Sequence, residues 1–440
     1  MTMSPSLSKK TDPQLAMFGG EPAVPSTLTG GTWPVVSSAE EAAVLRVLRS
    51  GKLTATAEGE TEVAALEQEW AQVCGVDHCT AVSSGTAALQ VALRALDIGP
   101  GDEVVLPALT MNATAQAVLQ VGATPVFADI DPDTFTLDPA AAAATCSSST
   151  AALLPVHLHG LPADMDMLNS LARRIGVPVV EDAAQAHGAL YAGQPTGSLG
   201  AAGCFSLHPS KNLPTCGEGG LITTTSPSVH AATLALRNFG ERPPTRARSY
   251  IAHRSAGNAR LGPVQASFTR AQLHRFRDDL RRRDCEIRTF LGRLENLPGL
   301  RVPHVPLDRT HAWHILRFML VPDEMGLADL PPAAIRAALH RILRAERVPV
   351  SQYQTAPLQA HPAFRMDVSL NDVAAAAPVA CATIDGSLCL QRRHLAPGAA
   401  PLLSAYADGF EKVWQHLELV RRIAGSSPAV SSWRETLEAE

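Results

Sequence analysis

Between residues 101 and 224, short apolar runs alternate with segments in which apolar residues recur at helical spacing. The runs are continuously apolar rather than alternating, which is typical of strands buried on both faces. They span residues 103–107, 124–128, 151–156 and 177–180, with helices expected between them, for example over 112–121 and 165–175. Strands joined by helices make βαβ units and a mainly parallel sheet. The pattern therefore predicts a large α/β domain.

The pattern changes after a long helix that is expected to begin at Pro263 and to continue towards Leu294. A strand over 314–321, a helix over 331–343 and a closing helix over 401–424 then predict a smaller α+β domain. The 440 residues are 46% hydrophobic, which suffices for two cores. The predicted divisions are a disordered tail at 1–14, an N-terminal arm and large domain at 15–272, a small domain at 273–424 and a tail at 425–440.

Two local patterns add detail. Ser38 and Glu41 have the spacing of a capping box, which predicts a helix over 38–50. Residues 242–262 are rich in Arg, Pro and Gly and lack periodicity, so they are expected to form an irregular loop. Its length suggests a function or a subunit contact.

Charge and composition exclude several classes of protein. The formal net charge of −5 is mild for this length and argues against a dedicated nucleic-acid-binding or membrane-surface protein. No run approaches the length of a membrane span, and residues 1–14 lack the apolar core of a signal peptide. The eight cysteines form no CxxC pair or metal-like cluster, so no metal site is expected. We therefore expect a cytoplasmic protein without nucleic-acid or membrane partners.

Residues 204–224, CFSLHPSKNLPTCGEGGLITT, contain one lysine, Lys211, on a turn expected between two short buried strands. A lysine held beside Ser206, Asn212 and several glycines can present its amine to a carbonyl group and form a Schiff base. The alternative is an ordinary solvated lysine on a loop. The segments upstream favour the chemical role.

The apolar run at 177–180 leads into two carboxylates, Glu181 and Asp182, and then into Gln185 and His187. Ligands of open α/β sheets bind at the carboxyl ends of strands. Asp182, Gln185 and His187 are thus expected where a cofactor can meet them.

Residues 79–89 predict a strand, a tight turn at Ser84 and Gly85, and then a helix. The amides of Gly85, Thr86 and Ala87, together with the helix dipole, make a seat for a phosphate group. Taken alone, a Ser-Gly-Thr sequence before a helix is more often a plain N-cap. Pyridoxal phosphate (PLP) needs a phosphate seat, a carboxylate for its ring nitrogen and a lysine for its aldehyde, and all three occur here in order.

Four motifs, SSGTAAL, VEDAAQAHGA, FSLHPSKNL and GEGG, carry a resemblance to a known family. Over about residues 15–420 the chain resembles the DegT/DnrJ/EryC1/StrS family of PLP-dependent aminotransferases, which have the fold type I architecture with a seven-stranded type of sheet. The arm GGxP…WP also resembles the subset that contains 3-amino-5-hydroxybenzoate synthases and scyllo-inosose aminotransferases.

The resemblance implies roles for individual residues. Lys211 and Asp182 would be catalytic, with Lys211 holding PLP and Asp182 keeping the ring nitrogen charged. Gln185 would lie near the ring hydroxyl. The remaining cofactor-binding residues are the phosphate ligands Gly85, Thr86 and Ser206, the ring-covering Met111, where relatives carry an aromatic residue, and Asn258.

Asn258 would reach the PLP phosphate of a second subunit, so the resemblance implies a homodimer with shared active sites. A role in turn formation is the alternative for Asn258. Tyr353, Arg392 and Arg393 lie where relatives bring the small domain towards the substrate; Arg392 or Arg393 would bind the donor carboxylate or be solvated. His157 and His159 would face the substrate or be structural.

By resemblance, the protein moves an amino group from Gln or Glu to a keto-sugar or keto-cyclitol destined for a specialised metabolite such as an antibiotic. A sugar dehydratase of the same family normally has His at the position of Lys211, which argues against that activity. A synthase that aromatises a cyclic acceptor, an elimination or cyclisation enzyme, and a PLP-binding regulator without turnover remain alternatives.

Overall fold

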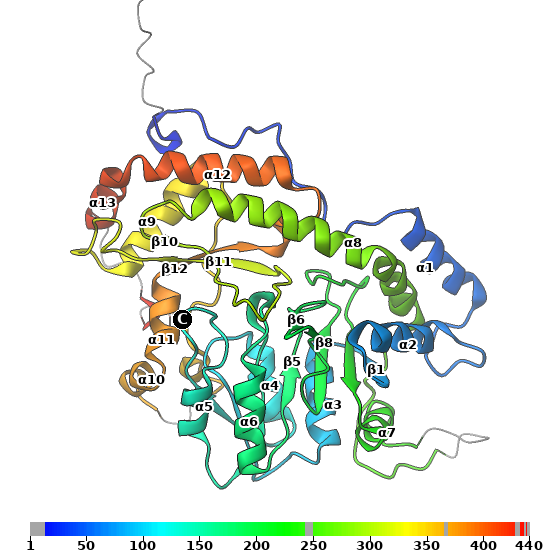
Figure 1. The fold of residues 1–440 in the computed structure, drawn as a ribbon. Coiled ribbons are helices and arrows are strands. Elements are labelled where there is room, and N and C mark those ends of the chain that lie inside the picture. Colours follow the sequence, from blue (N-terminus) through cyan, green and yellow to red (C-terminus); the bar gives the residue numbers. More distant parts are fainter. Residues whose placement is uncertain (1–13, 243–249, 365–367, 427–431, 435–436, 438–440) are drawn as a thin grey trace, which may run out of the picture.

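The computed structural model describes residues 14–242, 250–364, 368–426, 432–434 and 437. Most of the expected N-terminal tail, residues 243–249 of the expected loop and most of residues 427–440 therefore lie outside the described residues. The described chain forms two bodies joined by the long helix α8 (Pro263–Leu294), which crosses the view in Figure 1 just below α12 (Ala400–Trp414).

The larger body is built on one sheet. One part has the strand order β1 (His78–Val82), β9 (Gly220–Thr224), β8 (Ala202–Ser206), β5 (Val180–Asp182), and the other β3 (Thr124–Ala128), β2 (Glu103–Pro107), β4 (Thr150–Leu153). Parallel bridges from Leu153 to Val179 and from Val156 to Asp182 join β4 to β5. Only β9 pairs antiparallel with its neighbours in this sheet, so the predicted mainly parallel sheet is confirmed.

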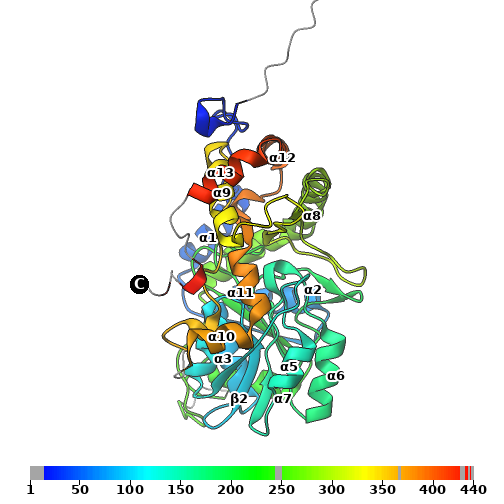
Figure 2. The ribbon, with the colours of Figure 1, turned by 90° about the vertical axis from the view of Figure 1, so that its left-hand side faces the viewer.

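Helices cover both faces of the sheet, which explains the continuously apolar strands. In β2, Val104 and Leu106 pack with α3 (Gly85–Ala95) and α4 (Asn112–Gln120), whereas Val105 packs on the opposite face with α6 (Met165–Ile175). Figures 1 and 2 show α5 (Pro139–Thr145) and α6 on one side of the sheet and α3 on the other. Successive residues of a strand point to opposite faces, so both must be apolar here.

The expected strand at 177–180 is wrong in its position, because β5 begins only at Val180. Pro178 has no N–H group to donate to a neighbouring strand, and Val179 makes only an isolated bridge. The effect is to place β5 so that its carboxyl end is Asp182.

The smaller body has the antiparallel sheet β10 (Leu300–Arg301), β11 (Ile315–Leu320), β12 (Ser387–Gln391). Its helices include α9 (Pro332–Ala345), whereas α10 (Leu370–Ala376) and α11 (Pro378–Asp385) share a core cluster with residues of the larger body such as Ala108 and Ile130. The single closing helix expected over 401–424 is instead two helices, α12 (Ala400–Trp414) and α13 (Leu417–Ser426). Gln415 and His416 separate them. Leu15 and Val24 of the N-terminal arm are buried in the same core.

The first helices pack along α8. The helix α1 (Ser38–Ser50) is capped by Ser37 and Glu40, one residue earlier than the expected Ser38 and Glu41. Glu40 is fully buried because it also accepts hydrogen bonds from Gln272 and Arg275 of α8. Glu40 thus both caps α1 and bonds to α8.

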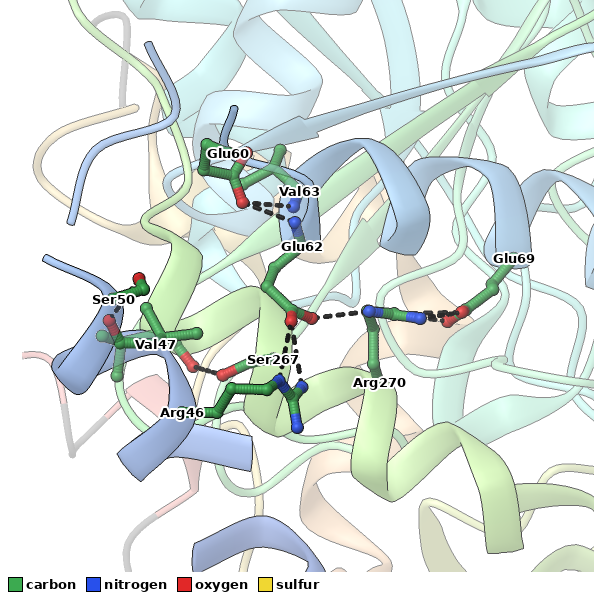
Figure 3. Close-up of polar contacts among 10 residues, drawn as sticks. Arg46, Val47, Ser50, Glu60, Glu62, Val63, Glu69, Ser267 and Arg270 are labelled. Atoms are coloured by element: carbon green, nitrogen blue, oxygen red, sulfur yellow. Dashed lines mark hydrogen bonds and ion pairs between the residues drawn. The ribbon is translucent and has the colours of Figure 1, made fainter. Parts of the chain in front are cut away.

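Charged contacts attach α2 (Glu62–Cys74) to α8. Figure 3 shows Arg270 of α8 between Glu62 and Glu69, with donor–acceptor distances of 2.6 Å to each carboxylate. Arg46 of α1 donates to the other oxygen of Glu62 at 2.9 Å. The network ties α1, α2 and α8 together.

Part of the expected C-terminal tail is packed. Trp433 is 3% exposed, joins a core cluster that includes residues of α11, and donates its backbone N–H to Asp385 at 3.0 Å. No helix in the described ranges is long and apolar enough to span a membrane.

Candidate active site

A cavity of about 700 Å³ opens at the carboxyl ends of β5 and β8 and at the first turn of α3. We call it the Lys211 cavity. Its lining includes the predicted site residues Gly85, Thr86, Met111, Asp182, Gln185, Ser206 and Lys211. The sequence motifs, which are far apart along the chain, therefore converge on one cavity at the sheet edge where ligands of α/β proteins bind.

Lys211 lies on the loop between β8 and β9, as expected from the sequence. Its backbone N–H donates to His208 at 2.8 Å, and its carbonyl accepts from the indole of Trp33 at 3.2 Å. Burial lowers the pKa of Lys211 to about 8, while the charges of Asp182 and Glu218 oppose the shift. A much larger share of this amine than of an ordinary lysine is consequently neutral, and so nucleophilic, near neutral pH.

Asp182 ends β5 inside the cavity. Its Oδ2 accepts from the hydroxyl of Thr114 at 2.8 Å and its Oδ1 from the amide of Ala184 at 3.1 Å. Burial raises the pKa of Asp182, although both hydrogen bonds act to lower it. Each carboxylate oxygen retains a second lone pair, so Asp182 can accept another hydrogen bond from a protonated ring nitrogen.

The neighbouring Glu181 has a different environment. It accepts from His157 at 2.9 Å and from the backbone amides of Gly197, Leu199 and Gly200. The Nδ1 atom of His157 in turn accepts from Ala163. His157 is thus a structural partner of Glu181 and does not line the Lys211 cavity.

The first turn of α3 faces β8 closely. A Cβ atom at Gly85 would lie 2.7 Å from the Cβ of Ser206, so any larger residue there would push the two elements apart. The side chain of Ser84 accepts from the amide of Ala87 at 3.0 Å. Ala87 is therefore already bonded, contrary to the expected seat, and Gly85, Thr86 and Ser206 remain to hold a phosphate group.

Gln185 is held by a buried chain of hydrogen bonds. Its Oε1 accepts from the backbone of His159 at 2.8 Å, and the Nε2 of His159 accepts from Arg317 at 3.0 Å. Burial, together with the nearby Arg317, keeps the pKa of His159 well below its usual value, so this imidazole is neutral and can accept. His159 thus holds the side chain of Gln185 in place without lining the cavity. Tyr353, by contrast, lines the cavity.

Met111 and Asn258 occupy different positions. Met111 is the N-cap of α4, lines the Lys211 cavity and is 49% exposed, so its thioether is accessible to a ligand. Asn258 does not line this cavity; it borders a separate hollow of about 260 Å³ beside α3. Within one subunit Asn258 is not brought together with the other predicted residues.

The two arginines after β12 also differ. Arg393 is exposed, whereas Arg392 is 2% exposed, so the alternative of a solvated Arg392 is wrong. Both line the Lys211 cavity, together with three residues not expected from the sequence, Thr114, Glu218 and His314. No local pattern marks Thr114 or His314, and Glu218 lies within the GEGG motif without a role having been expected for it; the placement of all three depends on contacts between distant segments. No cluster of metal-ligating side chains occurs in the part of the chain that the structure describes.

Comparison with known proteins agrees with this geometry. The model of the DegT/DnrJ/EryC1/StrS aminotransferase family matches residues 34–395. The dTDP-3-amino-3,4,6-trideoxy-alpha-D-glucose transaminase of Streptomyces venezuelae is 40% identical over 294 residues, which are 67% of this chain and 75% of that protein. The UDP-N-acetyl-3-dehydro-alpha-D-glucosamine 3-aminotransferase of Acidithiobacillus ferrooxidans is 40% identical over 279 residues, 63% of this chain and 73% of that protein.

A solved structure of 3-amino-5-hydroxybenzoic acid synthase superposes with a TM-score of 0.79 at 29% identity, covering 91% of this chain and 99% of that one. The fold type I architecture expected from the sequence is therefore confirmed. With a family match that spans most of its length and a Lys211 cavity at the expected sheet edge, the chain belongs to the DegT/DnrJ/EryC1/StrS family and is an aminotransferase.

Proposed function

We propose that the protein binds PLP in the Lys211 cavity and transfers an amino group from Gln or Glu to a ketone on a nucleotide-linked sugar or a cyclitol, in the cytoplasm and as part of specialised metabolism. The observation that carries the proposal is the convergence of Lys211, Asp182 and the Gly85 turn on one cavity of about 700 Å³. The names of the two curated relatives, both of which act on nucleotide-linked amino sugars, support the choice of acceptor.

The residues present fit PLP. The close approach of Gly85 to Ser206 leaves backbone amides at the cavity wall for the phosphate. Asp182 has unused acceptor capacity for the ring N–H, and Lys211 offers a partly neutral amine for the aldehyde. When bound, PLP supplies an electron-withdrawing ring that stabilises negative charge on the substrate carbon.

The protein's own groups then carry out the proton transfers. Lys211 Nζ would take up the proton released from the α-carbon of the donor and later give it back, because its pKa of about 8 suits both tasks near neutral pH. Asp182 would keep the ring nitrogen of bound PLP protonated, and Gln185 would lie near the ring. The donor leaves as a 2-oxo acid, and the reverse steps place the nitrogen on the ketone.

Asn258 fits the site of a second subunit in this proposal. It lies away from the cavity of its own chain, in a hollow lined by Ser83, Gln90 and Gln120. A homodimer in which this face meets the partner's cavity would bring Asn258 to the other phosphate seat. Two-fold symmetry would then complete both sites at once.

The test has two stages. The visible spectrum of the purified protein with PLP is followed while L-glutamine, L-glutamate and other amino acids are added in turn, with Lys211→Ala as the matched control. Conversion to the pyridoxamine form by one donor in the wild type only is expected. Incubation with a panel of keto-sugar nucleotides and keto-cyclitols, read by mass spectrometry, then identifies the acceptor.

Other outcomes point to the alternatives. A wild-type protein whose PLP absorbance responds to no amino acid would be a regulator or a non-transaminating enzyme, and the proposed function would fail. An aromatic product from a cyclic ketone would instead place the protein with the 3-amino-5-hydroxybenzoic acid synthase that it resembles in fold.

A further inference from the structure

Two buried threonines border the Lys211 cavity beside Asp182. Thr114 lies in the first turn of α4, whereas Thr110 lies on the loop between β2 and α4. Both contribute to the cavity lining. A buried hydroxyl is costly unless it is hydrogen-bonded, so the partners of these two side chains indicate what they do.

The two hydroxyls form a chain that ends on Asp182. The hydroxyl of Thr114 donates to Asp182 Oδ2 at 2.8 Å, and the hydroxyl oxygens of Thr110 and Thr114 are 3.3 Å apart. An ionised carboxylate only accepts, and a hydroxyl has a single hydrogen, so the hydrogen of Thr114 is committed to Asp182. Thr110 is therefore the donor between the two threonines. Each bond in such a chain polarises the next one and strengthens it.

The fold anchors both ends of the bond between Thr114 and Asp182. The helix α4 begins at Asn112, and the backbone N–H of Thr114 donates to the carbonyl of Met111 at 3.1 Å. Asp182 is the last residue of β5, and its backbone N–H donates to the carbonyl of Pro155 at 2.9 Å. The hydroxyl on Oδ2 and the backbone amide on Oδ1 together limit rotation of the carboxylate. Its remaining lone pairs consequently keep one direction.

Asp182 needs support because its carboxylate is buried. Burial raises the pKa of Asp182, and the hydrogen bond from Thr114 is the largest influence that opposes burial. Other titratable groups face Asp182 from the elements packed around it. They are Lys211, His157, Tyr353 and Cys204.

Two of these four groups can carry a positive charge, and both have other roles. His157 is bonded to the carboxylate that precedes Asp182 in the chain, and the amine of Lys211 is the group that would react with the cofactor. Burial raises the pKa of the thiol and of the phenol, so both are neutral near neutral pH. The neutral donors, Thr114 and the amide of Ala184, are thus the supports of this charge that do not change during a reaction.

We propose that the hydroxyls of Thr110 and Thr114 act as positioning groups that keep Asp182 ionised and direct it towards the ring N–H of bound PLP. This inference rests on the proposed function and deepens it by assigning the residues that support the partner of the ring nitrogen. Both threonines act through Asp182 and need not touch the substrate. A protonated ring nitrogen makes the ring a better electron acceptor, so the relay affects the chemical step rather than binding of the donor.

Infrared spectroscopy of the full chain without cofactor measures the charge of Asp182. The band of the protonated carboxyl group is followed over a pH series and is assigned with Asp182→Asn. Thr114→Val removes the hydroxyl and should move the midpoint up by about 1 to 2 pH units, because a hydrogen bond to the charged form is lost. Thr114→Ser keeps a hydroxyl and should stay near the wild type. Thr110→Val should give a smaller upward shift.

Thr80→Val is the matched control. Thr80 is buried on β1, outside the lining of the Lys211 cavity, and its hydroxyl bonds to that of Thr233 at 2.8 Å. Thr80→Val should therefore lose a buried hydrogen bond between hydroxyls without moving the Asp182 band. Equal midpoints in the wild type and Thr114→Val would overturn the proposal.

Binding of a cofactor analogue separates a role at the ring nitrogen from a change in cavity shape. Equilibrium dialysis compares PLP with its deaza analogue, in which a C–H group replaces the ring nitrogen. Thr114→Val should weaken PLP roughly tenfold and should change the Kd of the analogue less than about twofold. Equal losses for the two ligands would mean that Thr114 only shapes the cavity, and the proposal would fail.

The donor half-reaction gives a further readout. In Thr114→Val the single-turnover rate constant should fall roughly tenfold, whereas the apparent Kd of L-glutamate should change little. A higher Kd with an unchanged rate constant would contradict a role through Asp182. If Thr114→Val does not fold, Thr110→Val carries the same infrared and binding tests. The infrared result does not depend on turnover, so it decides this inference even if the proposed function fails.

Discussion

Lys211 and Asp182 have pKa shifts of opposite direction within one cavity. Burial lowers the pKa of the lysine to about 8 and raises that of the aspartate. Each shift moves the group towards its neutral form, because both charges lose solvation inside the protein. The protonation states of Lys211 and Asp182 therefore depend on which charged groups lie next to them in the cavity.

The low pKa of Lys211 predicts how fast the protein without cofactor takes up PLP. Only the neutral amine attacks the aldehyde, so the rate of PLP attachment should rise with pH with a midpoint near pH 8 and then level off, whereas an ordinary lysine would give a midpoint near 10.5. Stopped-flow absorbance over a pH series measures this rate. A rate that is still climbing steeply at pH 10 would contradict the buried environment of Lys211.

The same shift affects stability, and its sign can be stated. The folded pKa lies below the unfolded value of 10.5, so between about pH 8 and 10.5 the unfolded chain binds more protons and the cofactor-free fold gains stability as pH rises. Lys211→Met removes the titrating group. Its urea-derived stability relative to the wild type should therefore be most favourable at pH 7 and should decline towards pH 10.5.

At the residue scale, the sequence was sufficient to place Lys211, Asp182 and Gly85 in one cavity. It was not sufficient for Arg392, for which burial could not be told from solvation, since Trp33 and Asn212 come from segments far away along the chain. Thr114 was missed for the same reason: its bond to Asp182 spans 68 residues. Chemistry that is encoded in a short motif is visible in sequence, whereas a long-range partner is not.

At the scale of elements, periodicity predicted types better than boundaries. The continuous apolar runs identified the buried strands, because burial on both faces is recorded in every residue of a strand. The boundary of β5 was shifted by Pro178, and the cap of α1 fell at Ser37 and Glu40, where Glu40 also meets α8. The sequence offers two capping pairs one residue apart, and the contacts of Glu40 with α8 distinguish them only in the folded chain.

The packing of α2 on α8 yields a prediction about stability. Arg270→Ala removes partly buried hydrogen bonds to Glu62 and Glu69 and should lower the free energy of unfolding by about 1 kcal/mol. Arg46→Ala, whose side chain is 60% exposed, is the control and should cost less than about 0.5 kcal/mol. Urea denaturation followed by circular dichroism measures both.

The pH dependence of this difference can also be predicted. Burial acts to raise the pKa of Glu62, but the hydrogen bonds from Arg46 and Arg270 outweigh it and lower the pKa from its ordinary value of 4.5. A lowered folded pKa means that the stabilisation is present above pH 4.5 and is lost as pH falls through the folded value. An Arg270→Ala effect that grew on acidification would contradict the network.

At the scale of the whole molecule, the proposed function includes a second subunit. Asn258 borders a hollow outside the cavity of its own chain. The resemblance to the family, not this position, makes the phosphate seat of another copy its expected partner. Neither composition nor periodicity indicates which surfaces of the chain meet, because an exposed residue at an interface looks like any other exposed residue. The homodimer was reached only through resemblance to the family.

Mixing two defective variants tests the shared site. Lys211→Ala should be inactive and Asn258→Ala should bind PLP weakly. In a heterodimer of the two, one site carries both substitutions and the other carries neither, so subunit exchange should restore about a quarter of the wild-type activity. No gain above the average of the separate variants, in a mixture shown by mass spectrometry to contain heterodimers, would place Asn258 outside the shared site.

The most direct test of the central claim is to locate the residue that carries the cofactor. The protein is incubated with PLP, reduced with borohydride to fix the lysine-bound cofactor, digested and mapped by tandem mass spectrometry. The account predicts one stoichiometric pyridoxyl modification, on Lys211 in the peptide that spans β8 and β9. Modification of another lysine such as Lys52 or Lys412, with Lys211 unmodified, would contradict the assignment of this cavity as the active site.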